Sequence, residues 1–325
     1  MKKNWISRLA VLSLALVMIT SCFVGGTFAK YVTKAEGQDH ARVAKWGVIV
    51  DIEGNAFATQ YETSDEAYEN AGGIYSVVAS NEDQVVAPGT NSEEVGSNLV
   101  ATVVGTPEVA ARYTIEGKNI KDVVLAAGTY TDYTKLVKND ADGSYGYTDT
   151  FTLDKDYAPI KWNLVISKGN THMNVANELY NALPANLIAA AENYGLTPNG
   201  CSFFDAIAIL KKVADNDTYM QVVNNALGNI VSGGRNFQLE ADKNAGTFKM
   251  SYDFDPNKVM DFTFELTWEW AFEQEDYEHF DKADTFLGNW MAVVMGQTID
   301  GFVAPDAPSS YEIDATLVAT ATQID

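Results

Sequence analysis

The sequence predicts a mainly β protein: an antiparallel, jelly-roll-like β-sandwich with an inserted helical block at about residues 172–232. Stretches near both ends alternate apolar and polar residues with the two-residue period of a half-buried strand. Between them the apolar residues recur with the period of an amphipathic helix. The chain of 325 residues is 46% hydrophobic and 11% aromatic, which is enough for a sizeable core. Since no low-complexity linker interrupts it, we expect one domain over residues 30–325.

The clearest strand is the stretch FTFELTWEWAF at 262–272. Its aromatic and apolar residues alternate with threonines and glutamates, so one face is predicted to be buried and the other exposed. The stretches TFKMSYDF (247–254), IKWNLVI (160–166) and YEIDATLVATATQID (311–325) alternate in the same way. Turn signals separate further predicted strands at WGVIVDIEG (46–54), LVATVVG (99–105), ARYTIEG (111–117) and YTDTFTL (147–153). Strands at both ends of the chain favour an antiparallel sandwich.

The predicted helical block lies between His172 and Ser232. Apolar stripes with helical spacing run through NVANELYNAL, NLIAAAENYG, SFFDAIAILKKVA and DTYMQVVNNALGNIVSGG. Ser202 stands three residues before Asp205, a spacing that fits a capping box at the start of the third helix. These helices are therefore expected to be inserted between strands of the β domain.

An export signal is predicted at residues 1–29. Basic residues precede an apolar run of about 16 residues, and small residues follow it. The run is shorter than the roughly 20 apolar residues of a stable membrane span, although a retained anchor is one alternative. The small side chains of TFA place cleavage after Ala29, so that the mature chain begins at Lys30. A loose lipobox, ITSC, offers a second alternative in which Cys22 becomes a lipidated N-terminus.

The charge balance argues against nucleic acid as a partner. The chain has 22 basic and 44 acidic residues, and a phosphate backbone would be repelled by such a surface. Membrane contact is expected only through the signal peptide or through a lipid on Cys22.

The sequence contains no recognisable catalytic, cofactor or metal site. The three histidines, His40, His172 and His279, lack the spacing of a zinc motif, and no nucleophile elbow or phosphate-binding glycine loop is present. The stretch KNDADG at 138–143 is interpreted as a hairpin turn rather than a calcium loop. The acidic run FEQEDYEHFDKAD at 272–284 is interpreted as a solvated surface loop. These features favour a structural or binding protein over an enzyme.

Several short motifs flank almost the whole chain. They are GGTFAKY (25–31), DHARVAKWGV (39–48), APGT (87–90), GTPEVA (105–110), LTWEWAFE (266–273), DKADTFLG (281–288) and the closing ATATQID. In these motifs the chain resembles the TasA and camelysin family of secreted bacterial proteins. The resemblance implies a jelly-roll-like β-sandwich, removal of the leader by the signal peptidase SipW, and assembly into extracellular fibres of the biofilm matrix. Camelysin-like relatives have been described as metalloproteases, but this sequence supplies no recognisable zinc site.

The resemblance also implies a role for the segment from Lys30 to about Val50. In TasA-like fibres such a segment adds as a strand to the next subunit, which is β-augmentation. A head-to-tail contact of this kind, when it does not close, produces a filament. The other interpretation is that this stretch is the first strand of its own sandwich. The proposed donor strand consists of Ala41, Arg42, Val43, Ala44, Lys45, Trp46, Gly47 and Val48.

Three functions are compatible with the sequence. The first is a secreted, non-enzymatic matrix subunit that forms a homopolymer and has SipW as its processing partner. The second is a surface adhesin or glycan-binding module that recognises its ligand through the helical insertion. The third is a secreted metalloprotease.

Overall fold

The computed structural model describes residues 44–57, 60–63, 75–78, 86–88, 90–92, 98–120, 122–139, 141–198, 200–270, 277–299, 301–305 and 313–324. The chain divides between Lys45 and Trp46 into two compact units, and every element below belongs to the second. The predicted cleavage site at Ala29 and Lys30, the alternative lipidation site at Cys22, and the proposed donor residues Ala41, Arg42 and Val43 lie outside the described residues.

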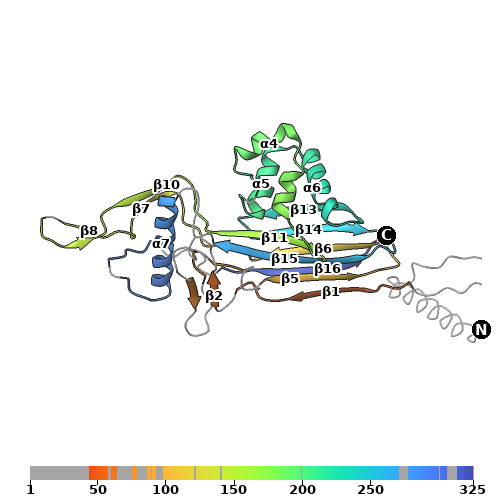
Figure 1. Ribbon diagram of the computed structural model, residues 1–325, viewed down its shortest axis with the longest axis horizontal. Coiled ribbons are helices and arrows are strands. Elements are labelled where there is room, and N and C mark those ends of the chain that lie inside the picture. Colours follow the sequence, from red (N-terminus) through yellow and green to blue (C-terminus); the bar gives the residue numbers. More distant parts are fainter. Residues whose placement is uncertain are drawn as a thin grey trace, which may run out of the picture. The chain divides into compact units, whose positions relative to one another are not determined.

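The larger of the two main sheets is antiparallel and has β15 at its centre (Figure 1). Its strand order is β1 (Val48–Glu53), β5 (Leu99–Gly105), β15 (Met260–Trp270), β11 (Ile160–Lys168) and β12 (Thr171–Asn174), with β4 (Thr90–Asn91) also paired to β15. Along β15, Phe262, Phe264 and Leu266 are buried, whereas the intervening Thr263 and Glu265 are more exposed. The predicted alternation is confirmed over 262–266, and Trp268 and Trp270 are buried with Glu269 exposed between them, but Thr267, predicted on the exposed face, is buried.

The second main sheet has four antiparallel strands. Their order is β13 (Gly234–Asp242), β14 (Thr247–Phe254), β6 (Ala111–Lys118) and β16 (Thr316–Gln323). The strands predicted at 99–105, 111–117, 160–166 and 247–254 are present in these two sheets. The final strand begins at Thr316, later than the predicted start of the pattern at residue 311.

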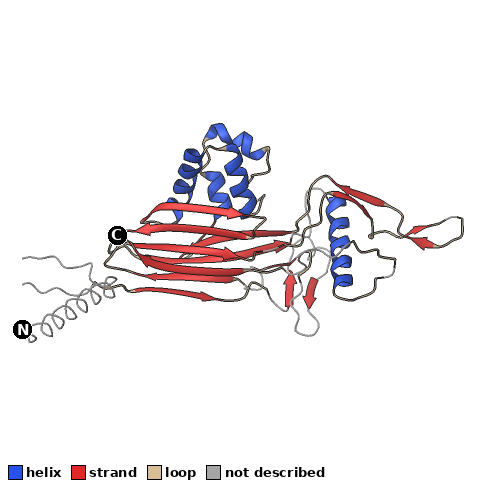
Figure 2. Ribbon diagram, turned by 180° about the vertical axis from the view of Figure 1, so that it is seen from behind, coloured by secondary structure: helices blue, strands red, loops and turns tan. Residues whose placement is uncertain are grey.

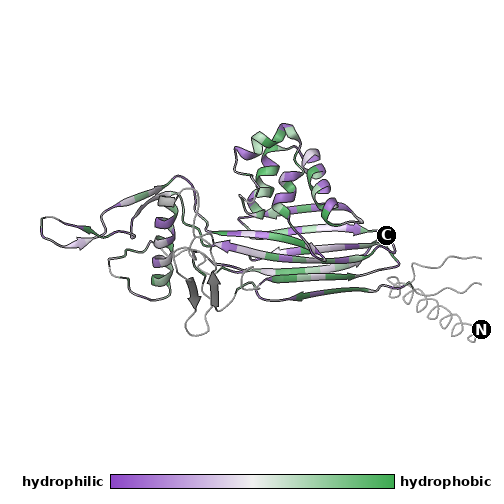
Figure 3. Cartoon of the chain, in the orientation of Figure 1, coloured by the Kyte–Doolittle hydropathy of each residue, from purple (hydrophilic) through white to green (hydrophobic). Residues whose placement is uncertain are grey.

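The two sheets share one hydrophobic core, which gives the β-sandwich-like arrangement. Tyr113 of β6 lies 5.4 Å from Tyr252 of β14 and 5.5 Å from Phe264 of β15, measured between ring centroids. All three side chains are fully buried. Aromatic contacts of this kind add to the free energy of burying the rings. Hydrophobic and hydrophilic residues are interspersed along the strands (Figure 3), as a sheet with one buried face requires.

A block of four helices packs along one side of the sandwich (Figures 1 and 2). Its members are α3 (Val175–Asn181), α4 (Ala185–Glu192), α5 (Phe203–Val213) and α6 (Asn216–Ile230). α5 and α6 contact β13, while α3 and α5 contact β11. The Ser202 hydroxyl accepts the backbone N–H of Asp205 at 3.1 Å, which confirms the N-cap half of the predicted capping box. The Asp205 carboxylate accepts from the Ser202 hydroxyl at 2.7 Å. The buried faces of these helices extend the core of the sandwich.

A second hydrophobic cluster is built from α7 (Tyr277–Val294), the pair β7 (Gly128–Thr131) and β10 (Thr150–Leu153), and neighbouring loops. Two short antiparallel pairs complete the described elements: β2 (Gln60–Thr63) with β3 (Tyr75–Val78), and β8 (Val137–Lys138) with β9 (Tyr145–Gly146). The β8–β9 pair confirms the hairpin turn predicted at 138–143.

Two sequence predictions were wrong in detail. His172 does not start the helical block, because Thr171–Asn174 pairs with β11 and the first helix begins at Val175. The acidic run at 272–284 is not a loop throughout, because α7 begins at Tyr277. The buried apolar residues of α7 stand at helical spacing (i, i+3, i+4 and i+7) and form one stripe, most of which follows the last acidic residue of the helix, Asp284. They are Ala283, Phe286, Leu287 and Trp290.

Candidate functional site

The described part of the proposed donor segment enters the chain's own sheet. Ala44, Lys45, Trp46 and Gly47 have no regular secondary structure, and Val48 begins β1, where it pairs with Gly105. Trp46 and Val48 also pack against the main core. Val48 is thus part of the first strand of this sandwich.

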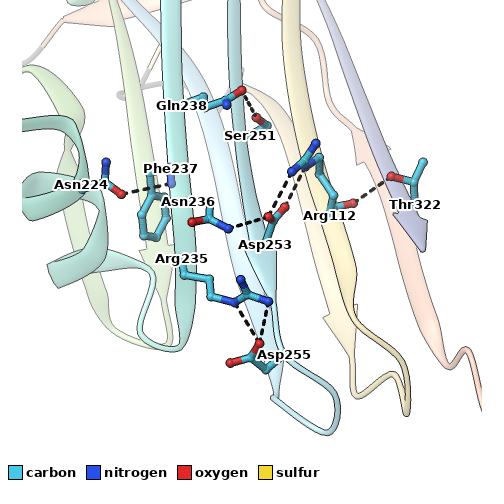
Figure 4. Close-up of polar contacts among 10 residues, drawn as sticks. All are labelled: Arg112, Asn224, Arg235, Asn236, Phe237, Gln238, Ser251, Asp253, Asp255 and Thr322. Carbon is cyan, nitrogen blue, oxygen red and sulfur yellow. Dashed lines mark hydrogen bonds and ion pairs between the residues drawn. The ribbon is translucent and has the colours of Figure 1, made fainter. Parts of the chain in front are cut away.

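Side chains of α6 occupy the free edge of β13. Antiparallel strands direct the backbone groups of alternate residues toward one neighbour and those of the intervening residues away from it. In β13 the residues directed away from β14 include Phe237 and Leu239. The Phe237 N–H donates to Asn224 Oδ1 at 3.2 Å (Figure 4), and the Leu239 carbonyl accepts from the Tyr219 hydroxyl at 2.5 Å. The helix therefore takes the place that another strand would occupy.

The edge of the larger sheet on the helical side is short. β12 has four residues and leads directly into α3, whose first turn is capped by Asn174. Short edge strands and covering helices are the usual protection of a sheet against pairing with a second chain.

The opposite edge of the larger sheet is β1, which is partly protected. The Thr106 N–H donates to the Gly47 carbonyl, so Val48, Val50 and Ile52 direct their backbone groups away from β5. The Asp51 carboxylate accepts the outward N–H of Ile52 at 3.0 Å. On the outer face, the side chain of Ile49 is 68% exposed beside its cross-strand partner Val104, which is 43% exposed.

The corresponding edge of the second sheet is β16, and it carries no protecting device among the described residues. Its alignment with β6 places Ile324 opposite Ala110, and the Ile324 N–H donates to the Ala110 carbonyl. By alternation, Leu317, Ala319 and Ala321 direct their N–H and C=O groups away from β6. The strand TLVATATQ contains neither a charged residue nor proline.

β1 and β16 lie on the same side of the sandwich. β16 contacts both β1 and β5 across the core, yet no described strand pairs with the free edge of either β1 or β16. We call these two strands the open side; the side covered by α3–α6 is the capped side.

The outer face of the second sheet carries a polar network of side chains from β13, β14 and β6 (Figure 4). Arg112 donates to both oxygens of the Asp253 carboxylate, at 2.7 and 3.1 Å, and Asn236 donates to Asp253 Oδ2 at 3.0 Å. Burial alone would raise the pKa of Asp253, but these hydrogen bonds outweigh it and lower the pKa. The network joins β13, β14 and β6 and thereby fixes the register of the sheet.

One serine, histidine and glutamate meet on the larger sheet. Ser167 Oγ lies 2.7 Å from His172 Nδ1 and 3.4 Å from Glu265 Oε1. In a catalytic triad the acid orients the histidine, which in turn activates the serine. Here the serine stands between the other two, so this contact set lacks the order that nucleophilic catalysis requires.

A buried carboxylate, Asp284, and a half-buried one, Asp122, lie where the sandwich meets the second cluster. Asp284 Oδ1 accepts from the Tyr157 hydroxyl at 2.5 Å and from Trp270 Nε1 at 3.1 Å. Burial raises the pKa of Asp284 to about 6 and that of Asp122 to about 7. Tyr157 also exchanges two backbone hydrogen bonds with Leu125. These contacts anchor α7 to the end of β15.

Within the described residues, no group of three or more histidine, cysteine, aspartate or glutamate side chains is placed to hold a metal ion. None of the helices in that part of the chain is both long enough and apolar enough to cross a membrane.

The sequence did not reveal the contacts that cover β13. Asn224 was a weak signal, because it is a polar residue beside the apolar stripe of α6, but its partner Phe237 lies 13 residues away. No family model, curated protein or solved structure matches this chain.

Proposed function

We propose that the protein is a secreted, non-enzymatic subunit of an extracellular matrix that associates with copies of itself through the open side of its sandwich. The proposal combines the export signal predicted at residues 1–29 with the resemblance of the sequence to TasA-like fibre proteins. Signal peptidase SipW would release the mature chain at Lys30, as the resemblance implies.

The contrast between the two sides of the sandwich carries the proposal. Exposed backbone groups along a sheet edge are a template for another strand, and soluble proteins normally block them. The capped side satisfies Phe237 and Leu239 through α6. The open side leaves the outward groups of Leu317, Ala319 and Ala321 without such a cover among the described residues. A subunit with one blocked and one open side can add strands in one direction only.

The jelly-roll assignment belongs to the same proposal. The connections from β5 to β6 and from β14 to β15 pass from one sheet to the other. All described strand pairs of both sheets are antiparallel. This pattern supports a sandwich of jelly-roll type, with the helical block inserted between β12 and β13.

The test is recovery of the protein from cells that secrete it, followed by N-terminal sequencing and electron microscopy of the same material. We expect a chain that begins at Lys30 and forms filaments. A variant that lacks residues 30–43 should remain unassembled, while a variant with the same residues in scrambled order serves as its control. The deletion ends at 43 because Trp46 packs against the core and Val48 belongs to β1. Secreted wild-type protein that stays monomeric at high concentration would contradict the proposal.

A further inference from the structure

We infer that a groove between the helical block and the second sheet binds a linear polysaccharide that carries no acidic groups. The groove begins at the capped side of the sandwich and includes neither strand of the open side. The inference therefore goes beyond the proposed function and does not depend on it, because one subunit could bind a glycan chain while its open side remains available.

The groove consists of two hollows that adjoin each other. The first, of about 380 Å³, lies where α5 and α6 meet β13. The second, of about 440 Å³, lies over β13, β14 and β6. Both are lined by Lys211 and Glu240, so together they form one continuous groove. Small-molecule sites usually enclose about 300–1,000 Å³, and the space here suffices for a short stretch of a sugar chain.

The rim of the first hollow offers both hydrogen-bond donors and acceptors. Lys211 and Asn216 belong to the two helices, whereas Gln238 and Glu240 belong to β13, and all four residues are exposed. An ammonium group only donates and a carboxylate only accepts, while a side-chain amide does both. Because each sugar hydroxyl also donates and accepts, this rim can satisfy several neighbouring hydroxyls of one sugar.

The floor of the first hollow is apolar and is held in place. It is formed by the buried residues Tyr219 and Leu239 and by half-buried Met220. The Tyr219 hydroxyl donates to the Leu239 carbonyl, which fixes the ring, and Lys211 Nζ lies 5.7 Å from the centroid of that ring. The C–H groups of a sugar ring can pack against this floor while its hydroxyls reach the polar rim.

The charges that line the groove are balanced. In the second hollow, Lys118 and Lys249 each contact the Glu116 carboxylate at 3.1 Å, and Glu240 lies opposite Lys249 in the register of β13 and β14. In all, three lysines and three acidic residues line the two hollows, whereas the whole chain has a net charge of −22. A polyanion would be repelled by the chain and would find no surplus of positive charge here.

The same lining disfavours a protein as the ligand. Protein interfaces are anchored by large aromatic and apolar side chains that fill pockets between the partners. In the groove, the residues of this kind are Tyr219, Leu239 and Phe248, and all three are already buried in the core of this chain. The exposed surface of the groove is therefore mainly polar, which suits a glycan better.

The test is calorimetric titration of the secreted full-length protein with three hexamers, made of β-linked glucose, β-linked N-acetylglucosamine and galacturonate. We expect at least one of the two uncharged hexamers to bind and the acidic hexamer not to bind. Glu240→Ala removes an acceptor that lines both hollows. Its matched control is Glu269→Ala, at an exposed position of β15 outside the groove. Glu240→Ala should weaken binding about tenfold, and the control should leave it unchanged.

A second pair of variants keeps the test decisive if Glu240→Ala disturbs β13, which circular dichroism and the thermal midpoint would reveal. Lys211 and Lys212 are neighbours in the last turn of α5, and both are exposed. Only Lys211 lines the groove. Lys211→Ala and Lys212→Ala change the net charge equally, so a loss of affinity confined to Lys211→Ala would report the groove itself.

The inference would be overturned if neither uncharged hexamer bound the wild type, or if the galacturonate hexamer bound as tightly as they do. Equal losses in Lys211→Ala and Lys212→Ala would also overturn it. Glu240→Ala should form the same filaments as the wild type, and loss of filaments in this variant alone would contradict a separate site. Wild-type protein that binds a hexamer but forms no filaments would reject the proposed function and leave the inference intact.

Discussion

The cap that α6 places on β13 should contribute measurably to stability. Asn224→Leu keeps the size of the side chain but removes the acceptor for the Phe237 N–H. Tyr219→Phe removes only the hydroxyl that donates to the Leu239 carbonyl. When a buried backbone N–H or C=O group loses its hydrogen-bond partner, the free energy of unfolding falls by about 1–3 kcal/mol. In Asn224→Leu, the higher helix propensity of leucine offsets a few tenths of a kcal/mol of this loss.

Urea unfolding of the secreted protein would measure these effects. The matched controls are Asn225→Leu, at an exposed position of the same helix, and Tyr180→Phe, whose hydroxyl bonds to Glu192 at the surface. We expect the controls to change the free energy of unfolding by less than about 0.5 kcal/mol. The Tyr219→Phe/Asn224→Leu double variant should also associate more strongly in sedimentation experiments, because two outward backbone groups of β13 lose their partners on α6.

Equal stability of Asn224→Leu and Asn225→Leu would refute the reasoning about the cap. A double variant that is destabilised but stays as monomeric as the wild type would show that α6 stabilises the fold without preventing strand pairing at the edge of β13.

Three further predictions concern other parts of the molecule. Burial raises the pKa of Asp284 from an ordinary 3.8 to about 6, so the folded state favours the protonated carboxyl. The resulting stabilisation is fully present below pH 3.8, the pKa in the unfolded chain, and is lost as the pH rises through 6. The loss corresponds to about 3 kcal/mol, so Asp284→Asn should flatten the dependence of the unfolding free energy on pH between 4 and 7; an unchanged slope would contradict this. Phe264→Ala, at a fully buried position, should cost about 3–5 kcal/mol in urea unfolding, whereas Ile49→Ala, at an exposed position, should cost less than about 0.5 kcal/mol; similar losses at both sites would be inconsistent with the core described above. Burial raises the pKa of the Cys201 thiol to about 11, so a thiol reagent at pH 8 should label native protein far more slowly than urea-unfolded protein, and equal rates would count against that burial.

The sequence predicted the strands of the core well because a strand with one buried face alternates apolar and polar residues. Phe262, Phe264 and Leu266 alternate with polar residues in the sequence, and all three are buried in β15. The helix α7 was not predicted because the acidic run at its start was interpreted as a solvated loop, although Ala283, Phe286 and Leu287 have helical spacing. Periodicity alone would have revealed the stripe that they form.

The pairing of the strands could not be predicted from local patterns. β16 pairs with β6 although some 200 residues separate them in the chain. The local sequence of neither strand indicates its partner. The cap on β13 is a similar case, because Asn224 and Tyr219 act on backbone groups that every sequence possesses. The distinction between the capped and the open side therefore emerged only from the structure.

Hydrogen exchange of backbone amides, compared between monomeric and assembled protein, tests the central claim most directly. If copies associate through the open side, the outward amides of Ala319 and Ala321 should become protected in the assembled state. The amide of Phe237, which already bonds to Asn224, should keep the same protection in both states. Protection that appears only in α3–α6 and leaves β1 and β16 unchanged would contradict the account.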